Sequence, residues 1–210
     1  MKKLSALDIA KYFLILVDRD EGDAMTHLKL QKLIYFAQGV SLACTDTLLF
    51  DEPMMAWPHG PVSSSVYSHY KIFAQNAIPQ PPEMDFDIYD QSIKNLICKV
   101  YNFYGGRTAS YLRNLSHEHI AWKNANNSDD KTIDYNDVKT DFANSEYMNN
   151  LDVSNIEKQA IIDAEDQWWM SYDCGVPSED ITERLLEHKA LFEKDPQTFI
   201  NSCTPLEDII

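Results

Sequence analysis

The sequence predicts a mainly α-helical protein: a single helical domain with a short, proline-rich insertion that is irregular or a β-hairpin, and a helical, acidic C-terminal extension. Three observations support this fold class. Apolar residues recur along most of the chain at the roughly 3.6-residue spacing of amphipathic helices. The segment 48–62 lacks that spacing and contains three prolines. Charge is also uneven, because residues 1–144 carry a net charge of −4 and residues 145–210 carry −11. We therefore divide the chain into a body, 1–144, and an extension, 145–210.

The body begins with two predicted helices. The apolar stripe in LDIAKYFLILVDR predicts the first helix over 7–19. Thr26 is the expected N-cap of the second, over 27–43, because its side-chain oxygen can accept a hydrogen bond from the first turn. Lys29 and Lys32 fall away from the apolar stripe of this second helix. We expect both lysines on its solvated face.

The proline-rich segment 48–62 predicts a turn-rich corner or a short hairpin, because proline fixes φ and removes a backbone donor. In its turn, Gly60 is expected to adopt a positive φ. Ser63 can cap a following helix over 65–73, and 76–87, with three more prolines, predicts a loop.

Further helices follow in the body and in the extension. One runs from Ile88 and is expected to end at Gly105 or Gly106 in the left-handed conformation. Thr108 caps a short helix over 109–119, and 134–144 predicts another. The polar stretch 123–131 is expected to be a loop. In the extension, capping signals at Ser154 and Pro177 predict two helices.

Nothing in the sequence supports an enzyme. His117 and His119 form a close pair, but residues i and i+2 of a helix point to different faces, and zinc needs three or four converging ligands. No nucleophile elbow, dinucleotide fingerprint or phosphate-binding loop occurs. The four cysteines have neither zinc nor redox spacing. We expect no catalytic activity, no bound metal and no cofactor.

The charge and the N-terminal residues limit the partners. A net charge of −15 argues against a large nucleic-acid contact and favours a basic partner. The start, MKKLSALDIAKYF, lacks the apolar run of a signal peptide, and the run YFLILV at 12–17 is too short to span a bilayer. We expect a cytoplasmic protein that contacts neither nucleic acid nor membrane.

Three blocks, 26–43, 49–71 and 104–122, resemble the Panacea domain family in their order and spacing. The resemblance covers about 7–144. Three departures lie in the third block, where Ser116 replaces a threonine, His119 stands where glutamate is common, and Ala121 stands where proline is common. The matching positions are interpreted as a scaffold, with both tryptophans stabilising the core. They are Lys29, Gln31, Lys32, Tyr35, Phe36, Trp57, Gly60, Pro61, Val62, Tyr67, His117 and Trp122.

The resemblance implies an antitoxin that is encoded beside a toxin and neutralises it by direct binding. Members of the SocA type act instead as adaptors that deliver the toxin to a ClpXP-type protease, so an adaptor is one alternative. An acidic mimic of nucleic acid is another. Exposed apolar helix faces could also pair two copies of the chain.

The acidic extension is the predicted toxin-binding surface. We expect residues 150–205 to form helices that present carboxylates and aromatic anchors to a basic toxin. The candidate contact residues are Trp168, Trp169, Asp163, Asp166, Glu183 and Glu187.

Overall fold

The computed structural model describes residues 4–19, 24–143 and 145. Within these residues the fold is mainly helical, with one two-stranded antiparallel sheet. The predicted fold class is therefore confirmed for the body. The two helices predicted for the extension, and the six candidate contact residues on it, lie outside the described residues. None of the described helices is long and apolar enough to cross a membrane.

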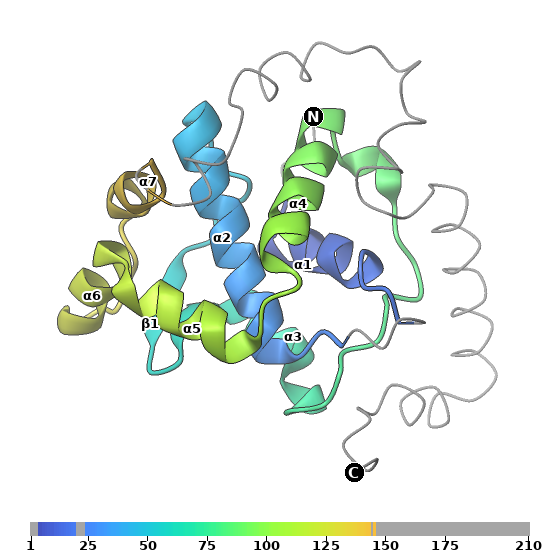
Figure 1. Ribbon diagram of the computed structural model, residues 1–210, viewed down its shortest axis with the longest axis horizontal. Coiled ribbons are helices and arrows are strands. Elements are labelled where there is room, and N and C mark those ends of the chain that lie inside the picture. The colour runs from blue at the N-terminus through green and yellow to red at the C-terminus, as the bar shows by residue number, and fades with distance from the viewer. Residues whose placement is uncertain (1–3, 20–23, 144, 146–210) are drawn as a thin grey trace.

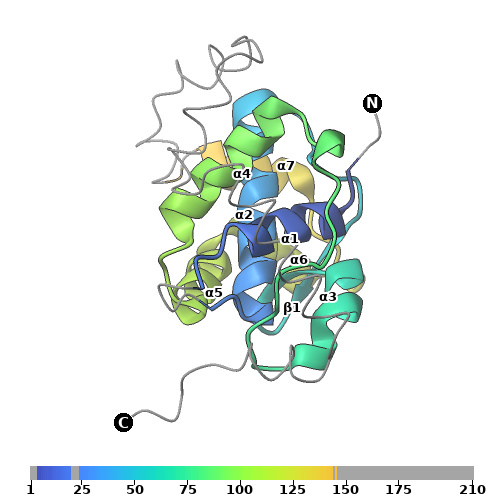
Figure 2. The same cartoon turned by 90° about the vertical axis from the view of Figure 1, so that its right-hand side faces the viewer.

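The helix α2 (His27–Thr45) runs through the middle of the molecule (Figure 1). The helices α1 (Ala6–Ile15) and α4 (Gln91–Tyr104) pack on one side of it, and α7 (Tyr135–Ala143) packs on another (Figure 1 and Figure 2). The helix α5 (Ala109–Glu118) crosses near its N-terminal half. A single long helix thus contacts most of the other elements.

Side-chain caps fix where α1 and α2 begin. Ser5 and Asp8 form a capping box: the Ser5 side chain accepts from the Asp8 amide, and the Asp8 carboxylate accepts from the Ser5 amide at 2.9 Å. The first helix ends at Ile15, earlier than predicted. Thr26 caps α2 as predicted, and its hydroxyl accepts from the Lys29 amide at 3.4 Å.

The proline-rich segment forms a hairpin, as expected for 48–62. Strands β1 (Met54–Trp57) and β2 (Gly60–Ser63) pair antiparallel, with Trp57 opposite Gly60 at the turn. Gly60 has a φ of +93°, which confirms the predicted positive φ. Residues 131–133 line the outer edge of β1, since the Ile133 amide donates to the Met54 carbonyl at 2.9 Å.

Short helices follow the hairpin. Ser63 caps α3 (Ser64–Tyr70), which continues into the 3-10 helix η1 (Lys71–Phe73). A second 3-10 helix, η2 (Phe86–Ile88), lies at the end of the predicted loop 76–87. These elements carry the chain from the hairpin to α4.

The predicted left-handed end of α4 is wrong. Gly105 has a φ of −61°, and neither Gly105 nor Gly106 is in the positive-φ region. The chain instead continues in a right-handed turn, in which the Gly105 amide donates to the Tyr101 carbonyl and the Arg107 amide donates to the Tyr104 carbonyl. This turn leads directly to Thr108, which caps α5 as predicted.

The predicted loop 123–131 is also wrong over its first part, because α6 (Ile120–Asn127) occupies it. The first amides of this helix, those of Ile120 and Ala121, donate to the two carboxylate oxygens of Asp141 at 3.0 and 2.8 Å. A helix start leaves its first amides without partners inside the helix. Because Asp141 belongs to α7, this cap is invisible in the local sequence.

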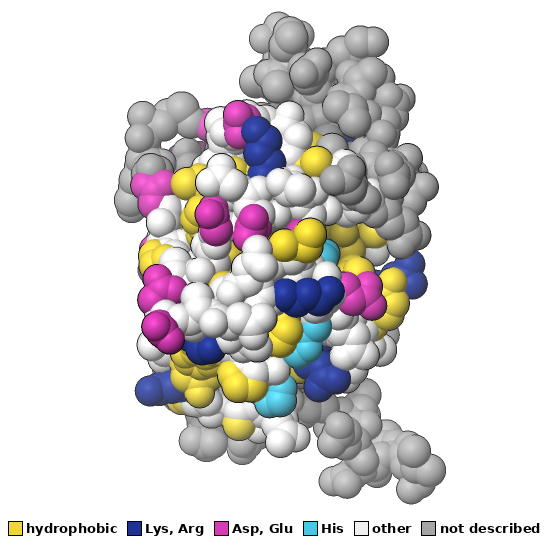
Figure 3. Space-filling model, turned by 90° about the vertical axis from the view of Figure 1, so that its left-hand side faces the viewer, with side chains coloured by type: hydrophobic (Ala, Val, Ile, Leu, Met, Phe, Trp, Pro, Cys, Tyr) yellow, Lys and Arg dark blue, Asp and Glu magenta, His cyan; other side chains and the backbone are white. Residues whose placement is uncertain are grey.

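One face of the molecule mixes charges (Figure 3). Asp and Glu side chains lie mainly in its upper and left parts and also on its right side, next to Lys and Arg (Figure 3). In its lower part, histidines lie beside hydrophobic, Lys and Arg side chains (Figure 3).

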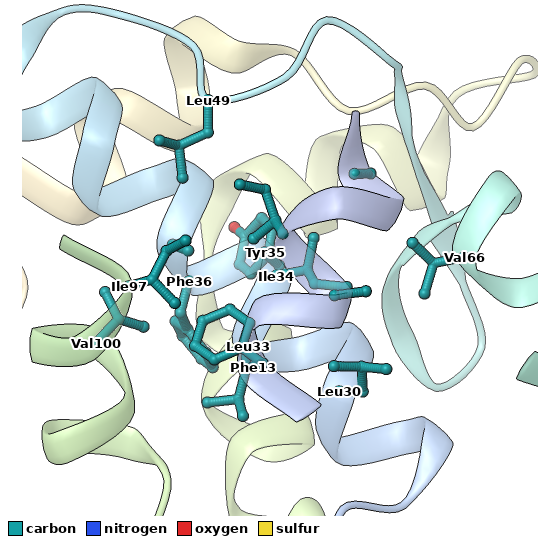
Figure 4. Close-up of a cluster of buried hydrophobic side chains, with 14 of the residues drawn as sticks. Phe13, Leu30, Leu33, Ile34, Tyr35, Phe36, Leu49, Val66, Ile97 and Val100 are labelled. Atoms are coloured by element: carbon teal, nitrogen blue, oxygen red, sulfur yellow. The ribbon is translucent and has the colours of Figure 1, made fainter. Parts of the chain in front are cut away.

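The core surrounds the apolar side of α2 (Figure 4). Leu30, Leu33 and Ile34 are fully buried there, with Phe13 from α1 and Ile97 from α4. Fully burying an aliphatic or aromatic side chain contributes about 1.5–3 kcal/mol. The predicted apolar stripe of the second helix is thus the centre of the core.

Candidate functional site

Two buried glutamines of α2 attach the hairpin region to the core. The Gln31 carbonyl oxygen accepts from the Ser63 amide at 2.8 Å, and its amide donates to the Ser63 carbonyl at 3.2 Å. About two turns further along α2, the Gln38 side chain accepts from the Leu49 amide and donates to the Phe50 carbonyl, both at 2.9 Å. Both ends of the segment 49–63 are therefore held by paired hydrogen bonds to α2.

Lys32 lies beside Gln31 and is fully buried, with 0% of its surface exposed. The prediction that it lies on a solvated face is wrong, because the hairpin covers this side of α2. Its ammonium group donates to the Pro61 carbonyl at 2.6 Å. Among the described residues, no carboxylate lies within ion-pair distance of Lys32. Burial, and secondarily the charge of Arg113, lowers the pKa of Lys32 to about 7.

Gly60 lets the hairpin turn rest directly on α2 and α5. A Cβ at this position would lie 2.7 Å from the Ser116 hydroxyl and 2.9 Å from the Lys32 ammonium. The Ser116 hydroxyl donates in turn to the Arg113 carbonyl at 2.7 Å. Any side chain at position 60 would therefore clash with Ser116 and Lys32, and it would force a residue with a Cβ into an unfavourable positive φ.

We name Lys32, His59, Arg113 and His117 the basic cluster, because the charges of Lys32, Arg113 and His59 all act on His117, and that of Arg113 also acts on Lys32. Burial lowers the pKa of His117 first, followed by the charges of Lys32, Arg113 and His59. The His117 Nε2 atom is buried and has no hydrogen-bond partner among the described residues. The Arg113 guanidinium donates to the Asn114 side chain at 2.8 and 3.1 Å, and His59 is exposed. No described carboxylate forms an ion pair with any member of this cluster.

A row of aromatic rings borders the basic cluster. The His117 ring stacks on Trp122 with 4.0 Å between ring centroids, and the Trp122 indole N–H donates to the Trp57 carbonyl at 3.1 Å. Trp57 meets Tyr67 edge to face at 4.7 Å. Tyr67 is 36% exposed, and both tryptophans are half-buried. The two tryptophans therefore pack between elements at the surface rather than deep in the core.

The next turn of α2 enters a purely aromatic layer. Tyr35 and Phe36 are fully buried, and Phe36 stacks on Tyr104 with 4.4 Å between centroids. The Tyr35 hydroxyl and His119 Nδ1 share a hydrogen bond at 2.9 Å. Burial lowers the pKa of His119 and raises that of Tyr35 well above its ordinary value. His119 thus acts as a hydrogen-bond partner for the buried Tyr35 hydroxyl.

The structure brings most of the predicted scaffold residues together around the hairpin. Tyr35 and Phe36 lie on the next helical turn of α2, after the turn that contacts the hairpin. Lys29 is half-buried on α2. Sequence reasoning did not identify Arg113 or His59 as site residues. The only local signal was that Arg113 and His117 are four positions apart on one predicted helix.

Comparison with protein families finds a match over residues 30–123 to the model of the antitoxin SocA-like, Panacea domain. Comparison with curated proteins and with solved structures finds no match. The matched segment contains the hairpin, the basic cluster and the aromatic row. It excludes α1 and α7, which nonetheless pack on α2. The resemblance read from the three sequence blocks is thereby confirmed as a match of residues 30–123 to the model of this family.

Proposed function

We propose that this protein is an antitoxin that neutralises a toxin, encoded beside it, by binding the toxin directly. The match of residues 30–123 to the antitoxin SocA-like family carries the proposal. The half-exposed aromatic row supports it, because tryptophan, tyrosine and arginine are enriched at the energetic centres of protein interfaces. No group of three or more side chains that could hold a metal ion exists in the described part of the chain.

The fixed hairpin supports tight binding. Association costs free energy whenever loops and side chains must be ordered at the interface. Gln31 and Gln38 already hold the hairpin segment through buried hydrogen bonds. Little of that cost would therefore remain when a partner binds.

The acidic extension supports a basic toxin as the partner. Residues 145–210 carry a net charge of −11, and opposite charges on the toxin would speed association. A variant that ends at residue 149 tests this contribution. Unchanged toxin affinity and unchanged association rate in that variant would remove the extension from the proposed interface.

The test of the proposal is co-expression with the product of the neighbouring open reading frame. That product should arrest growth alone, and the chain should restore growth and co-purify with it. A version of the chain's gene with a stop codon early in the reading frame is the control. Persistent toxicity beside a well-expressed, folded chain would overturn the antitoxin assignment.

The same experiment in a host without ClpXP separates blocking from delivery to a protease. Direct neutralisation predicts that rescue persists and that the half-life of the toxin does not shorten. Rescue that requires the protease would identify an adaptor. An acidic nucleic-acid mimic would instead capture basic DNA-handling proteins and leave the toxin active.

A further inference from the structure

We propose that the basic cluster binds an aspartate or glutamate side chain of the toxin. This inference rests on the proposed function for the source of the carboxylate. It assigns the region around the hairpin turn a specific chemistry: a group of basic side chains, bordered by aromatic rings, that receives one negative charge from the partner.

The first argument is electrostatic. The chain carries a net charge of −15, yet Lys32, Arg113 and His117 converge with no ion-paired carboxylate among the described residues. Removing a charge from water is costly unless it is paired. Asp141, whose charge acts on His119 and Tyr35, is not among the groups that act on Lys32 or His117. A carboxylate from outside would supply the missing opposite charge.

The second argument is geometric. The His117 Nε2 atom is buried without a hydrogen-bond partner among the described residues, and buried polar atoms are normally paired. The His117 ring is held in place by stacking on Trp122, which is itself bonded to the hairpin through Trp57. Arg113 adds a guanidinium fork, whose geometry suits a carboxylate. The His117 ring is thus held in place before any partner arrives, whereas the Arg113 fork exchanges its bonds to the Asn114 side chain for bonds to the carboxylate.

The third argument is access. His59 is exposed and Arg113 is half-buried, so a partner side chain can approach these two groups from solvent, whereas the buried His117 Nε2 atom is reached only when neighbouring side chains move aside. Lys32 lies behind the turn at Gly60 and does not contact the carboxylate of the toxin. It is a positioning residue, whose positive charge attracts the carboxylate without touching it. The neighbouring Tyr67 and Ile120, which are 36% and 51% exposed, provide an apolar border that would exclude water around the pair.

Binding should be coupled to proton uptake. The charged groups that face Lys32 are Arg113 on α5 and His27 on α2, and those that face His117 are Lys32, Arg113 and His59. All of them are basic. A carboxylate brought among them favours the protonated forms of Lys32 and His117. The affinity for the toxin should therefore increase as the pH falls from about 8 to about 6.

The first experiment measures toxin affinity by calorimetry. It compares four versions of the full chain: wild type, Arg113→Gln, Lys32→Met and Lys139→Met. Truncating one member of a buried charge pair costs enough to weaken binding about 30-fold. We expect a loss of that size for Arg113→Gln, a loss of about tenfold for Lys32→Met, and a flatter pH dependence in both. Lys139→Met is the charge-matched control, because Lys139 pairs with Asp46 at the surface, at the other end of α2. Wild-type affinity in both cluster variants would overturn the proposal.

The second experiment needs no toxin. The chain is titrated with N-acetyl-glutamate N-methylamide and, separately, with the matching glutamine compound, while the histidine ring resonances are followed by NMR. We expect saturable shifts of His59 and His117 with the glutamate compound alone, and their loss in Arg113→Gln. Equal shifts with both compounds, or none, would overturn the site. If the wild-type chain saturates with the glutamate compound but fails to bind the toxin, the proposed function fails and the carboxylate site stands.

Discussion

Two successive turns of α2 bury different chemistry. The turn with Gln31 and Lys32, which we call the hairpin turn of α2, lies under the hairpin. The turn with Tyr35 and Phe36, which we call the aromatic turn, packs against α4 and α7. All four side chains are at most 2% exposed. In the aromatic turn the buried Tyr35 hydroxyl has a partner, whereas in the hairpin turn a buried lysine lacks an opposite charge among the described residues.

This difference separates stability from binding. Close-packed aromatic rings contribute to the free energy of folding through burial and ring contacts. A buried ammonium group with a single hydrogen bond opposes folding. We therefore expect substitutions in the aromatic turn of α2 to destabilise the fold. Substitutions of Lys32 should leave the fold intact and weaken the affinity for the partner.

The largest effect should come from Phe142→Ala. Phe142 is fully buried and contacts the rings of Tyr35, Phe36 and His119. Removing such a ring costs about 3–5 kcal/mol, measured as the free energy of unfolding in urea. Ile120→Ala, which truncates a half-exposed side chain on α6, is the control and should cost far less. Because α7 lies outside the segment 30–123, a small loss would mean that α7 is dispensable for the fold.

Gln38→Ala should rank next. The substitution leaves the Leu49 amide and the Phe50 carbonyl without their partner in a buried site. We expect a loss of about 2–3 kcal/mol in unfolding free energy, since each orphaned buried group carries a penalty. Gln75→Ala, at an exposed position, is the matched control. A loss as small as that of the control would show that water replaces these bonds.

Lys32→Met should change how stability depends on pH. The folded protein releases the Lys32 proton near its pKa of about 7, while the unfolded chain keeps it to about 10.4. Between these values the unfolded state binds one more proton, so the unfolding free energy of wild type rises with pH, by at most about 1.4 kcal/mol per unit. Denaturant titrations from pH 7 to 9 should give a flatter dependence for Lys32→Met.

The same variant should be no less stable than wild type at pH 7, because methionine removes the buried charge and keeps a similar volume. Its one disadvantage is the lost hydrogen bond to the Pro61 carbonyl. If Lys32→Met instead unfolds the protein or retains the wild-type pH dependence, the proposed difference between the hairpin turn of α2, which contributes to binding, and the aromatic turn, which contributes to stability, is wrong.

Tyr35→Phe should have the smallest effect. It removes only the hydroxyl that bonds His119 Nδ1 and keeps the packed ring. We expect a loss of about 1 kcal/mol in thermal or urea unfolding. Combining it with His119→Phe should be less than additive, because both changes remove the same bond. Full additivity would argue against this hydrogen bond in solution.

Several features could be predicted from local sequence because their causes are local. Ser63 and Thr108 cap helices through bonds to amides within three residues, and Gly60 adopts the positive φ that its turn requires. The apolar spacing of 27–43 identified the core face of α2. The family resemblance depended on the same short blocks, and residues 30–123 confirm it.

By itself, then, the sequence determined the mainly helical class, most helix starts, the hairpin and the resemblance to the family whose model matches residues 30–123. Only the tertiary structure decided that Lys32 is buried, that Asp141 starts α6, and that Arg113, His117 and His59 gather at one place. Each of these depends on segments far apart in the chain, as when the hairpin covers Lys32 from 29 positions away. Helical spacing places a side chain on one face of a helix, but it does not reveal which distant element will cover that face.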